Sequence, residues 1–161
     1  VEKGRMIMEE EERMHNEVII LIAEDDEGHA GLIRKNLARA GISNHVEHFK
    51  DGQEIIDFLF RIGNGPHRRS HTPYILLLDI RMPKLDGTEV LKRIKEDHEL
   101  RKMPVIMITT TDDPREVERC HELGCSSYIT KPVEYDAFVN AVRQLGLYLA
   151  VVQVPQVNGV H

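Results

Sequence analysis

The sequence predicts an α/β fold in which five parallel strands form a doubly wound sheet covered by five helices. Strand-like runs alternate with helix-like segments through most of the chain, and this alternation is typical of a parallel sheet with helices on both faces. Three of the runs, at 18–23, 74–78 and 105–108, are almost continuously aliphatic. Strands that are buried on both faces have this composition.

The other two strands are shorter. Residues 44–49 alternate between apolar and polar side chains, so we expect this strand to lie at an edge of the sheet. The fifth strand is expected at 128–130. Right-handed crossovers should connect consecutive parallel strands.

Apolar residues spaced three and four positions apart predict the helices. The first helix should end at Gly41 and the second at Gly63, where C-cap glycines belong. The third is marked by apolar residues at 90–94, and the fourth begins at an acidic pair followed by Pro114. An apolar stripe at 138–149 predicts the fifth.

The chain has 161 residues, enough for one domain with a full core and few for two. We assign residues 18–149 to that domain. Residues 1–17 carry the glutamate run Glu9 to Glu12 and no apolar period, which predicts a mobile N-terminal arm. The valine-rich C-terminal tail, 150–161, would expose an apolar strip in a monomer. We therefore expect a two-fold homodimer in which the fifth helix and the tail pack against a second copy.

Charge and hydropathy exclude several classes of protein. The formal net charge of −6 argues against a nucleic-acid-binding surface, which needs clustered Lys and Arg. The one basic cluster, 61–69, is short and broken by glycines, so we expect a solvated loop. The apolar stretch at 18–23 is too short for a secretory leader and follows an acidic arm. We expect a soluble cytoplasmic protein that does not contact membranes.

Two cysteines, Cys120 and Cys125, admit two interpretations. Free buried or half-buried thiols are favoured, because most cysteines of a cytoplasmic protein are of this kind. A metal site that also uses His121 is the alternative, but this spacing lacks the second ligand pair of a structural zinc site.

Reactive side chains follow four of the predicted strands directly. An acidic run at 24–26 follows the first strand, and Asp79, Thr109 and Lys131 follow the third, fourth and fifth. Ligands of open parallel sheets bind outside the carboxyl ends of the strands, so these side chains should converge. Each one alone has an ordinary explanation as a loop carboxylate, a turn threonine or a solvated lysine. Their joint occurrence at four strand ends predicts a phosphoryl-transfer site.

The chemistry of these side chains gives each a role. Asp79 is ionised near neutral pH, so it can attack a phosphohistidine without a general base. Asp25 and Asp79 would bind Mg²⁺ through oxygen, with Glu24 or Asp26 holding its waters. The Lys131 ammonium would bind one phosphoryl oxygen, and Thr109 would donate a hydrogen bond to another.

Several motifs together resemble the receiver domain of two-component response regulators. They are the acidic pair at 24–25, the segment Leu-Leu-Leu-Asp-Ile-Arg-Met-Pro-Lys-Leu-Asp-Gly at 76–87, the Thr after Pro-Val-Ile-Met-Ile at 104–108, and Tyr128 with Lys131-Pro132. The resemblance covers about residues 18–149. The segment 61–73 and the short tail are similar to the single-domain regulators that partner phytochrome-type histidine kinases.

The resemblance implies a flavodoxin-like strand order of 2-1-3-4-5. It also implies phosphorylation of Asp79 by a sensor histidine kinase, for which a bacteriophytochrome is the candidate. It implies that the backbone carbonyl of Arg81 is a further Mg²⁺ ligand and that the Lys131–Pro132 bond is cis. It couples Thr109 to Tyr128 as a switch. Such a protein is not an enzyme in the usual sense, although it catalyses its own phosphoryl transfer and the hydrolysis of its phosphate.

The chain departs from the commonest pattern of that family in three places. Thr110 stands where a small residue is common, Arg81 is long and cationic, and Glu24 replaces an aspartate. The Arg81 side chain could shield the aspartyl phosphate or pair with the acidic residues. These differences bear on the lifetime of the phosphate.

A phosphohydrolase of the haloacid-dehalogenase type is the alternative function, because it also uses an aspartate nucleophile on an α/β sheet. The segment Leu85-Asp86-Gly87-Thr88 superficially resembles its motif. That motif needs its nucleophile at the position that Lys84 occupies. A receiver-like binding module without phosphorylation is a third possibility, which the complete set of reactive residues disfavours.

Overall fold

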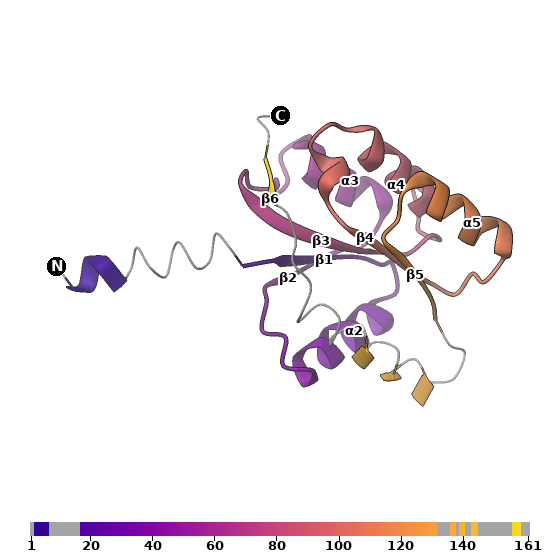
Figure 1. Ribbon diagram of the computed structural model, residues 1–161, viewed down its shortest axis with the longest axis horizontal. Helices are drawn as coiled ribbons and strands as arrows, with labels where there is room; N and C mark the ends of the chain where they lie inside the picture. Colours follow the sequence, from indigo (N-terminus) through magenta and orange to yellow (C-terminus); the bar gives the residue numbers. More distant parts are fainter. Residues whose placement is uncertain are drawn as a thin grey trace.

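A single sheet forms the centre of the computed structural model, which describes residues 2–6, 17–131, 136–137, 139–140, 143–144 and 156–158. Five strands of the sheet are parallel, in the order β2-β1-β3-β4-β5 (Figure 1). They are β1 (Ile19–Ala23), β2 (Val46–Phe49), β3 (Thr72–Leu78), β4 (Val105–Thr109) and β5 (Ser127–Thr130). The predicted fold class and strand order are confirmed, and β2 lies at an edge as expected.

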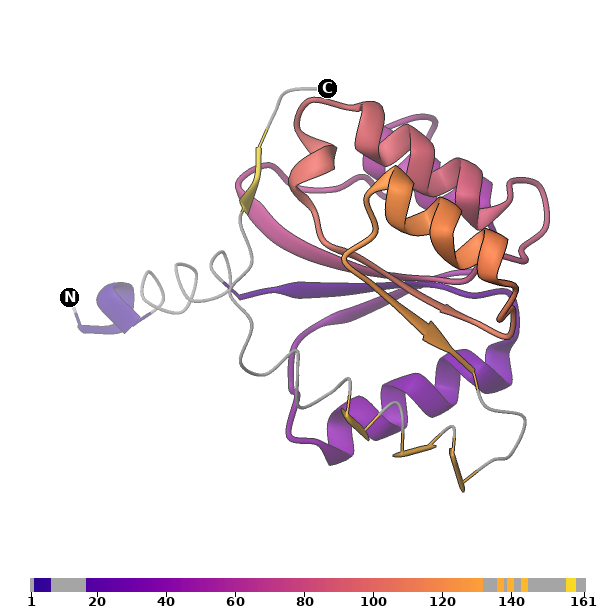
Figure 2. The ribbon, with the colours of Figure 1, turned by 45° about the vertical axis from the view of Figure 1, so that its right-hand side comes forward.

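Helices cover both faces of the sheet. Figure 2 shows α2 (Glu27–Arg39) on one face and α3 (Gly52–Phe60), α4 (Gly87–Glu96) and α5 (Pro114–Leu123) on the other. A short 3₁₀ helix, η1 (Leu100–Lys102), follows α4. The predicted fifth helix lies mainly outside the described residues. The parts of it that the structure describes, 136–137, 139–140 and 143–144, are helical.

Alternate residues of the central strands build two separate cores. Leu21 and Leu76 belong to the cluster on the side of α3, α4 and α5, whereas Ile20 and Ile75 belong to the cluster under α2. Successive side chains of a strand point to opposite faces, so aliphatic runs without polar interruption fill both cores.

Aspartates begin the four helices that cover the sheet, α2 to α5. Asp26, Asp51, Asp86 and Asp113 are the N-caps of α2, α3, α4 and α5, and each carboxylate accepts a hydrogen bond from a backbone N–H of the first turn. Such caps satisfy N–H groups that have no partner inside the helix. The capping aspartates also bring the strand-to-helix loops to a fixed geometry at one end of the sheet.

Helix ends are predicted less well than helix starts. Gly41 follows the C-cap of α2 at a φ of 83°, as expected. The prediction that the second helix ends at Gly63 is wrong, because Arg61 already adopts the left-handed conformation at a φ of 56°. The backbone N–H of Ile62 then donates to the carbonyl of Asp57 at 2.8 Å, which closes the last turn of α3.

The loop at 61–69 is not uniformly solvated, so that prediction is wrong at Arg68. This residue is 2% exposed, and burial lowers the pKa of its guanidinium. Its Nε donates to the carbonyl of Leu59 at 2.8 Å, and its Nη1 donates to that of Asn158 at 3.3 Å. A buried arginine therefore joins the loop to the C-terminal tail.

Part of the tail adds a strand that the sequence did not predict. Strand β6 (Gln156–Val157) pairs antiparallel with the start of β3, where Thr72 lies opposite Val157. The Val157 side chain is fully buried, and the backbone N–H of Asn158 donates to Oε2 of Glu99 at 3.1 Å. This segment folds back on its own chain and covers apolar surface there.

Among the helices that the structure describes, none is long and apolar enough to cross a membrane.

Candidate functional site

The predicted site residues converge at the carboxyl ends of the parallel strands. Glu24 and Asp79 follow the paired ends of β1 and β3, and the backbone N–H of Asp79 donates to the carbonyl of Ala23 at 3.0 Å. Thr109 ends β4 and Lys131 follows β5, with a 2.6 Å hydrogen bond from the backbone N–H of Lys131 to the carbonyl of Thr109. Four reactive residues thus come together as the sheet topology requires.

The Lys131 ammonium lies at the centre of the site. Its Nζ is 2.7 Å from Oε1 of Glu24 and 3.1 Å from Oδ2 of Asp79. All three side chains are buried, so these charge-assisted contacts are only weakly screened by solvent. The arrangement holds a cation against the two carboxyl groups that were predicted to bind metal and phosphate.

Burial and proximity move the pKa values of the two carboxyl groups in opposite directions. Burial, with the neighbouring Asp79 carboxylate, raises the pKa of Glu24 to about 8. Burial also acts to raise the pKa of Asp79, but the Glu24 carboxyl and the Lys131 ammonium outweigh it and lower this pKa below its ordinary value. At neutral pH Asp79 is therefore ionised, and Glu24 retains a proton in the metal-free state.

The acidic residues fit a divalent cation. Glu24, Asp25 and Asp79 each offer a carboxylate oxygen, and the three atoms lie within 4.8 Å of one another. Oδ1 of Asp79 is buried without a hydrogen-bond partner, which is an unfavourable state that a bound cation would relieve. Carboxylate oxygens are the ligands that Mg²⁺ prefers.

Two further residues of the predicted metal site are placed differently. Asp26 caps α2 and accepts from the backbone N–H of His29 at 3.0 Å, and it does not belong to the acidic group. The Arg81 side chain is mainly exposed, and its Nη2 lies 3.8 Å from Oε1 of Glu116 in α5. It therefore pairs with Glu116 and not with Glu24, Asp25 or Asp79. Pro132, whose bond to Lys131 was predicted to be cis, lies outside the described residues.

The predicted switch residues are linked through one segment of backbone. Thr109 is fully buried, and its Oγ1 accepts from the backbone N–H of Thr111 at 3.4 Å. The hydroxyl of Tyr128 donates to the carbonyl of Thr111 at 2.6 Å, and burial raises the pKa of this phenol to about 12. Thr109 and Tyr128 are therefore both hydrogen-bonded to the backbone of Thr111.

The loop after Asp79 runs through a narrow space between two helix starts. A Cβ on Gly52 would lie 2.0 Å from the carbonyl oxygen of Leu85, and a Cβ on Gly87 would lie 2.0 Å from that of Asp79. Only glycine fits at these two positions without moving the loop. The ion pair between Lys84 and Asp51, at 3.4 Å, fixes the loop from its outer side.

Two histidines contact Glu24, and no sequence motif marks either of them. His29 places Nδ1 at 3.0 Å from Oε1 of Glu24 and at 3.3 Å from Nζ of Lys131. His48, on the edge strand β2, contacts the carbonyl oxygen of Glu24 through Nε2 at 2.6 Å. Each is a lone histidine in a polar stretch, and only the folded chain brings it to the site.

The cysteines form no second metal site within the described part of the chain. Cys120 and Cys125 are free and buried, as the favoured interpretation expects. Sγ of Cys125 lies 3.7 Å from Nδ1 of His121, but the one candidate metal group found among the described residues is the acidic one. Burial raises the pKa of Cys120 to about 11, so its thiol stays protonated and poorly reactive.

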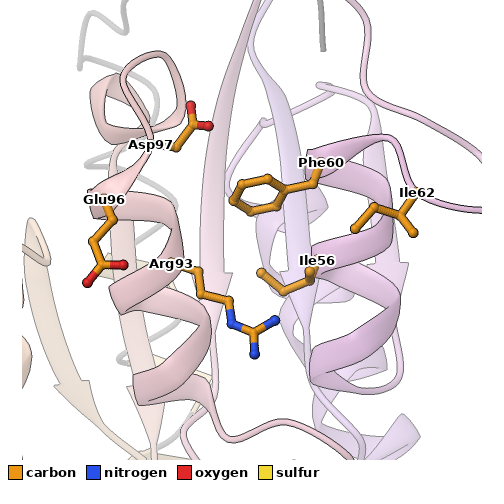
Figure 3. Close-up of a pocket in the computed structure, with 6 residues that line it drawn as sticks. All are labelled: Ile56, Phe60, Ile62, Arg93, Glu96 and Asp97. Carbon is orange, nitrogen blue, oxygen red and sulfur yellow. The ribbon is translucent and has the colours of Figure 1, made fainter.

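A pocket of about 340 Å³ lies elsewhere, between the C-terminal ends of α3 and α4 (Figure 3). It is lined by Ile56, Phe60, Ile62, Arg93, Glu96 and Asp97. Helices of a parallel α/β sheet run opposite to its strands, so these helix ends lie away from the carboxyl ends of the strands. The pocket contains none of the predicted site residues.

Comparison with known proteins agrees with this geometry. The model of the response regulator receiver domain matches residues 20–143. The probable methanogenesis regulatory protein FilR2 of Methanothrix harundinacea is 35% identical over 130 residues, covering 81% of this chain and 82% of that protein. No comparison supports the haloacid-dehalogenase alternative, and Asp86, which its motif would need, is the N-cap of α4.

Solved structures extend the similarity to the whole sheet. A response regulator receiver domain from Rhodospirillum rubrum is 45% identical with a TM-score of 0.79, covering 88% of this chain and 99% of that one. The Mn²⁺-bound form of response regulator Rcp1, a protein of Synechocystis, has 29% identity and a TM-score of 0.77 over 85% of this chain and 98% of that one. The phosphorylated cyanobacterial phytochrome response regulator RcpA has 28% identity and a TM-score of 0.74 over 87% and 99%. With its strand order, its acidic group and its buried Asp79, this chain belongs to the response regulator receiver domains.

Proposed function

We propose that this receiver accepts a phosphoryl group on Asp79 from a sensor histidine kinase, in a reaction that requires Mg²⁺. The observation that carries the proposal is the state of the Asp79 carboxylate. It is buried and ionised, its Oδ2 is 3.1 Å from Nζ of Lys131, and its Oδ1 has no hydrogen-bond partner. A carboxylate held in this way is ready to bind a cation and to attack phosphorus.

Each residue of the site has a distinct role in the proposed transfer. An oxygen of Asp79 forms a bond to phosphorus while the bond between phosphorus and the histidine nitrogen of the donor breaks. Lys131 donates to an oxygen of the transferred group, and Thr109 donates to another. Mg²⁺ held by Glu24, Asp25, Asp79 and the carbonyl of Arg81 would offset the negative charge of carboxylates and phosphoryl group.

Mg²⁺ is the cation we propose, because all the donor atoms of the acidic group are oxygens. The Mn²⁺ form of Rcp1 shows that a relative binds a divalent cation of similar preference. The protein would catalyse only its own phosphorylation and the slow hydrolysis of its own phosphate, and it has no other substrate in this proposal.

Signalling would follow from the link between Thr109 and Tyr128. At present the Oγ1 of Thr109 accepts a hydrogen bond from the backbone N–H of Thr111 at 3.4 Å. When Thr109 donates to a phosphoryl oxygen, this Oγ1 moves relative to Thr111. The Tyr128 hydroxyl is bonded to the carbonyl of the same Thr111. The proposed readout is a change of the surface formed by α5 and β5.

The proposed kinase is a bacteriophytochrome, which we expect the receiver to meet in the cytoplasm. The similarity to RcpA, a phytochrome response regulator, supports this choice. A homodimer stays part of the proposal, although the three apolar tail residues Val151, Val152 and Val154 lie outside the described part of the chain. Since Val157 is already buried against its own sheet, a dimer would need additional apolar surface from the rest of the tail or the last helix.

Mass spectrometry after exposure to acetyl phosphate and Mg²⁺ tests the phosphorylation. We expect one added phosphoryl group in the wild type, none without Mg²⁺ and none in Asp79→Asn. Asp86→Asn is the matched control, because asparagine caps a helix as well as aspartate does and Asp86 is not in the acidic group. Labelling of Asp79→Asn at a rate comparable to the wild type would refute the assignment.

A further inference from the structure

The pocket between the C-terminal ends of α3 and α4 has an apolar wall on the side of α3. Ile56 and Phe60 belong to this helix, and Ile62 follows it directly. Figure 3 shows the Phe60 ring extending from α3 toward α4. Ile62 is 49% exposed, which makes it the most exposed of the large apolar side chains within residues 17–131. The apolar wall is therefore open to solvent at one edge.

The opposite wall, formed by the end of α4, is charged, and its charges are unequally partnered. Nε of Arg93 lies 3.4 Å from Oε1 of Glu89, one turn earlier in the helix, so the positive charge is partly offset. Oδ1 of Asp97 accepts from the two backbone N–H groups at the start of η1, both at 2.9 Å. Within the described part of the chain, the exposed carboxylate of Glu96 has no hydrogen bond or ion pair. The pocket therefore carries an excess of negative charge.

Hydrogen bonds hold both walls in place before any partner binds. Arg61 ends α3 in the left-handed conformation, and the backbone N–H of Ile62 donates to the carbonyl of Asp57 at 2.8 Å. On the other side, the two bonds accepted by Asp97 fix the chain where it leaves α4. A preformed site lowers the entropic cost of binding, because its walls need not be ordered by the partner.

Size and charge select the kind of occupant. The volume of about 340 Å³ lies at the low end of the range of roughly 300–1,000 Å³ for pockets that enclose small molecules. Such a volume suits one large side chain and not a nucleotide or an extended cofactor. Large side chains that fill preformed pockets supply much of the energy of protein–protein binding. The excess of negative charge favours a partner with basic residues next to that side chain.

We propose that this pocket binds a protein partner that inserts one large apolar side chain against Phe60 and sets a flanking Lys or Arg against Glu96. The inserted side chain also lies against Ile56 and covers Ile62. This inference does not depend on the phosphorylation of Asp79. The pocket lies at the helix ends away from the carboxyl ends of the strands, so an occupant leaves Asp79 open to a kinase.

Capped tripeptides added to the full chain test the proposal. Acetyl-Lys-Phe-Lys-amide has the apolar side chain and both cations, acetyl-Glu-Phe-Glu-amide reverses the charges, and acetyl-Lys-Ala-Lys-amide removes the apolar group. Methyl NMR signals of Ile56 and Ile62 report occupation of the pocket. We expect saturable shifts with the first peptide and about fivefold weaker binding of the second, because exposed ion pairs each contribute little. The third should give no saturable shift, because it buries no large apolar group.

Three variants locate the binding. Glu96→Lys should weaken binding of the Lys-Phe-Lys peptide about fivefold and strengthen that of the Glu-Phe-Glu peptide. Glu118→Lys is the matched control, because it changes the net charge equally at an exposed position of α5 outside the pocket. Ile62→Ala should weaken the Lys-Phe-Lys peptide about threefold or more, because it removes part of the apolar wall. Unchanged amide signals away from the pocket show that each variant is folded.

Several results would overturn the proposal. They are the absence of a saturable shift with the Lys-Phe-Lys peptide, equal affinities for the two phenylalanine peptides, and equal effects of Glu96→Lys and Glu118→Lys. Phenethylamine has the same aromatic ring and a cation but no peptide backbone. Binding of phenethylamine as tight as that of the Lys-Phe-Lys peptide would assign the pocket to small amines and would overturn the choice of a protein partner.

Discussion

The Lys131 ammonium lies 2.7 Å from Oε1 of Glu24, although the two residues are 107 positions apart in the sequence. Both side chains are almost fully removed from water. Such a pair does not simply stabilise the fold, because removing two charges from water is costly. Burial raises the pKa of Glu24 to about 8, so near neutral pH a proton on this carboxyl group lowers the cost.

This proton makes the stability of the metal-free protein depend on pH. The pKa of Glu24 is raised from 4.5 to about 8, so between these values the folded state holds a proton that the unfolded state has lost. The contribution of Glu24 is fully present below pH 4.5 and is lost as the pH rises through about 8. We expect a loss on the order of a few kcal/mol in the free energy of unfolding across this window.

Urea denaturation with EDTA at pH 5 and pH 8.5 measures this loss, and Glu24→Gln should show a flatter dependence. Glu27→Gln is the control, because the Glu27 side chain is 78% exposed. Asp79 does not interfere, since a lowered pKa gives stability that is lost only as the pH falls below its ordinary value of 3.8. The same slope in Glu24→Gln and the wild type would contradict the prediction.

Mg²⁺ binding should release a proton near neutral pH. A carboxyl group has to be ionised to act as a strong metal ligand, and Glu24 is protonated below about pH 8. Calorimetric titration at pH 7 in two buffers of different ionisation enthalpy counts the released protons. Binding without proton release in the wild type would argue against Glu24 as a ligand.

The bound cation should also stabilise the fold. At ten times its dissociation constant, Mg²⁺ should add about 1.4 kcal/mol to the free energy of unfolding. A thermal melt with and without Mg²⁺ at that concentration measures this change. A melting temperature that millimolar Mg²⁺ leaves unchanged would count against the metal site.

Gly52→Ala should slow the labelling of Asp79 and reduce stability. The new Cβ would lie 2.0 Å from the carbonyl oxygen of Leu85, so the loop that follows Asp79 has to move. Overpacking of this kind costs about 1–3 kcal/mol. Gly31→Ala is the control, because nothing lies within 4 Å of its added Cβ and alanine favours a helix. Equal labelling rates in the two variants would show that this loop position is unimportant for the transfer.

Tyr128→Phe should separate phosphorylation from signalling. It removes the 2.6 Å hydrogen bond to the carbonyl of Thr111 but no group that contacts Asp79. We expect a loss of about 0.5–1.5 kcal/mol in stability and little change in labelling rate. The change in amide hydrogen exchange of α5 on phosphorylation should become smaller. An unchanged exchange response would exclude this tyrosine from the proposed switch.

Val157→Ala tests the tail strand. The residue is fully buried, and the loss of two methyl groups should cost about 1–2 kcal/mol. Labelling of Asp79 should not change, because Val157 pairs with Thr72 at the opposite end of β3. Ile62→Ala is the control, since Ile62 is 49% exposed.

Sedimentation of the wild type at tens of micromolar tests the proposed homodimer. A monomer both with and without phosphorylation would refute that dimer.

The parts of the fold that follow from local pattern could be predicted from the sequence. Uninterrupted aliphatic runs predicted the buried strands, and their order followed from the family resemblance. The site residues Glu24, Asp79, Thr109 and Lys131 were predictable because parallel strands end at one edge. Their convergence needs no knowledge of side-chain packing.

Features that depend on distant contacts could not be predicted in this way. Arg68 looks like a loop residue until its guanidinium is seen between the carbonyls of Leu59 and Asn158. Strand β6 is only two residues long and has no pattern of its own. His29 carries no motif, and its contact with Lys131 exists only in the folded chain, because Lys131 follows β5 on the other side of the sheet.

The position of β6 also bears on how reporter domains could be attached to this protein. It pairs with the start of β3, at the end of the sheet opposite Asp79, and β1 begins at that same end (Figure 2). A fluorescent domain joined beyond either segment would leave the carboxyl ends of the strands open to a kinase. The joint beyond β6 would need a flexible spacer, because a rigid fusion could pull Val157 from its buried place.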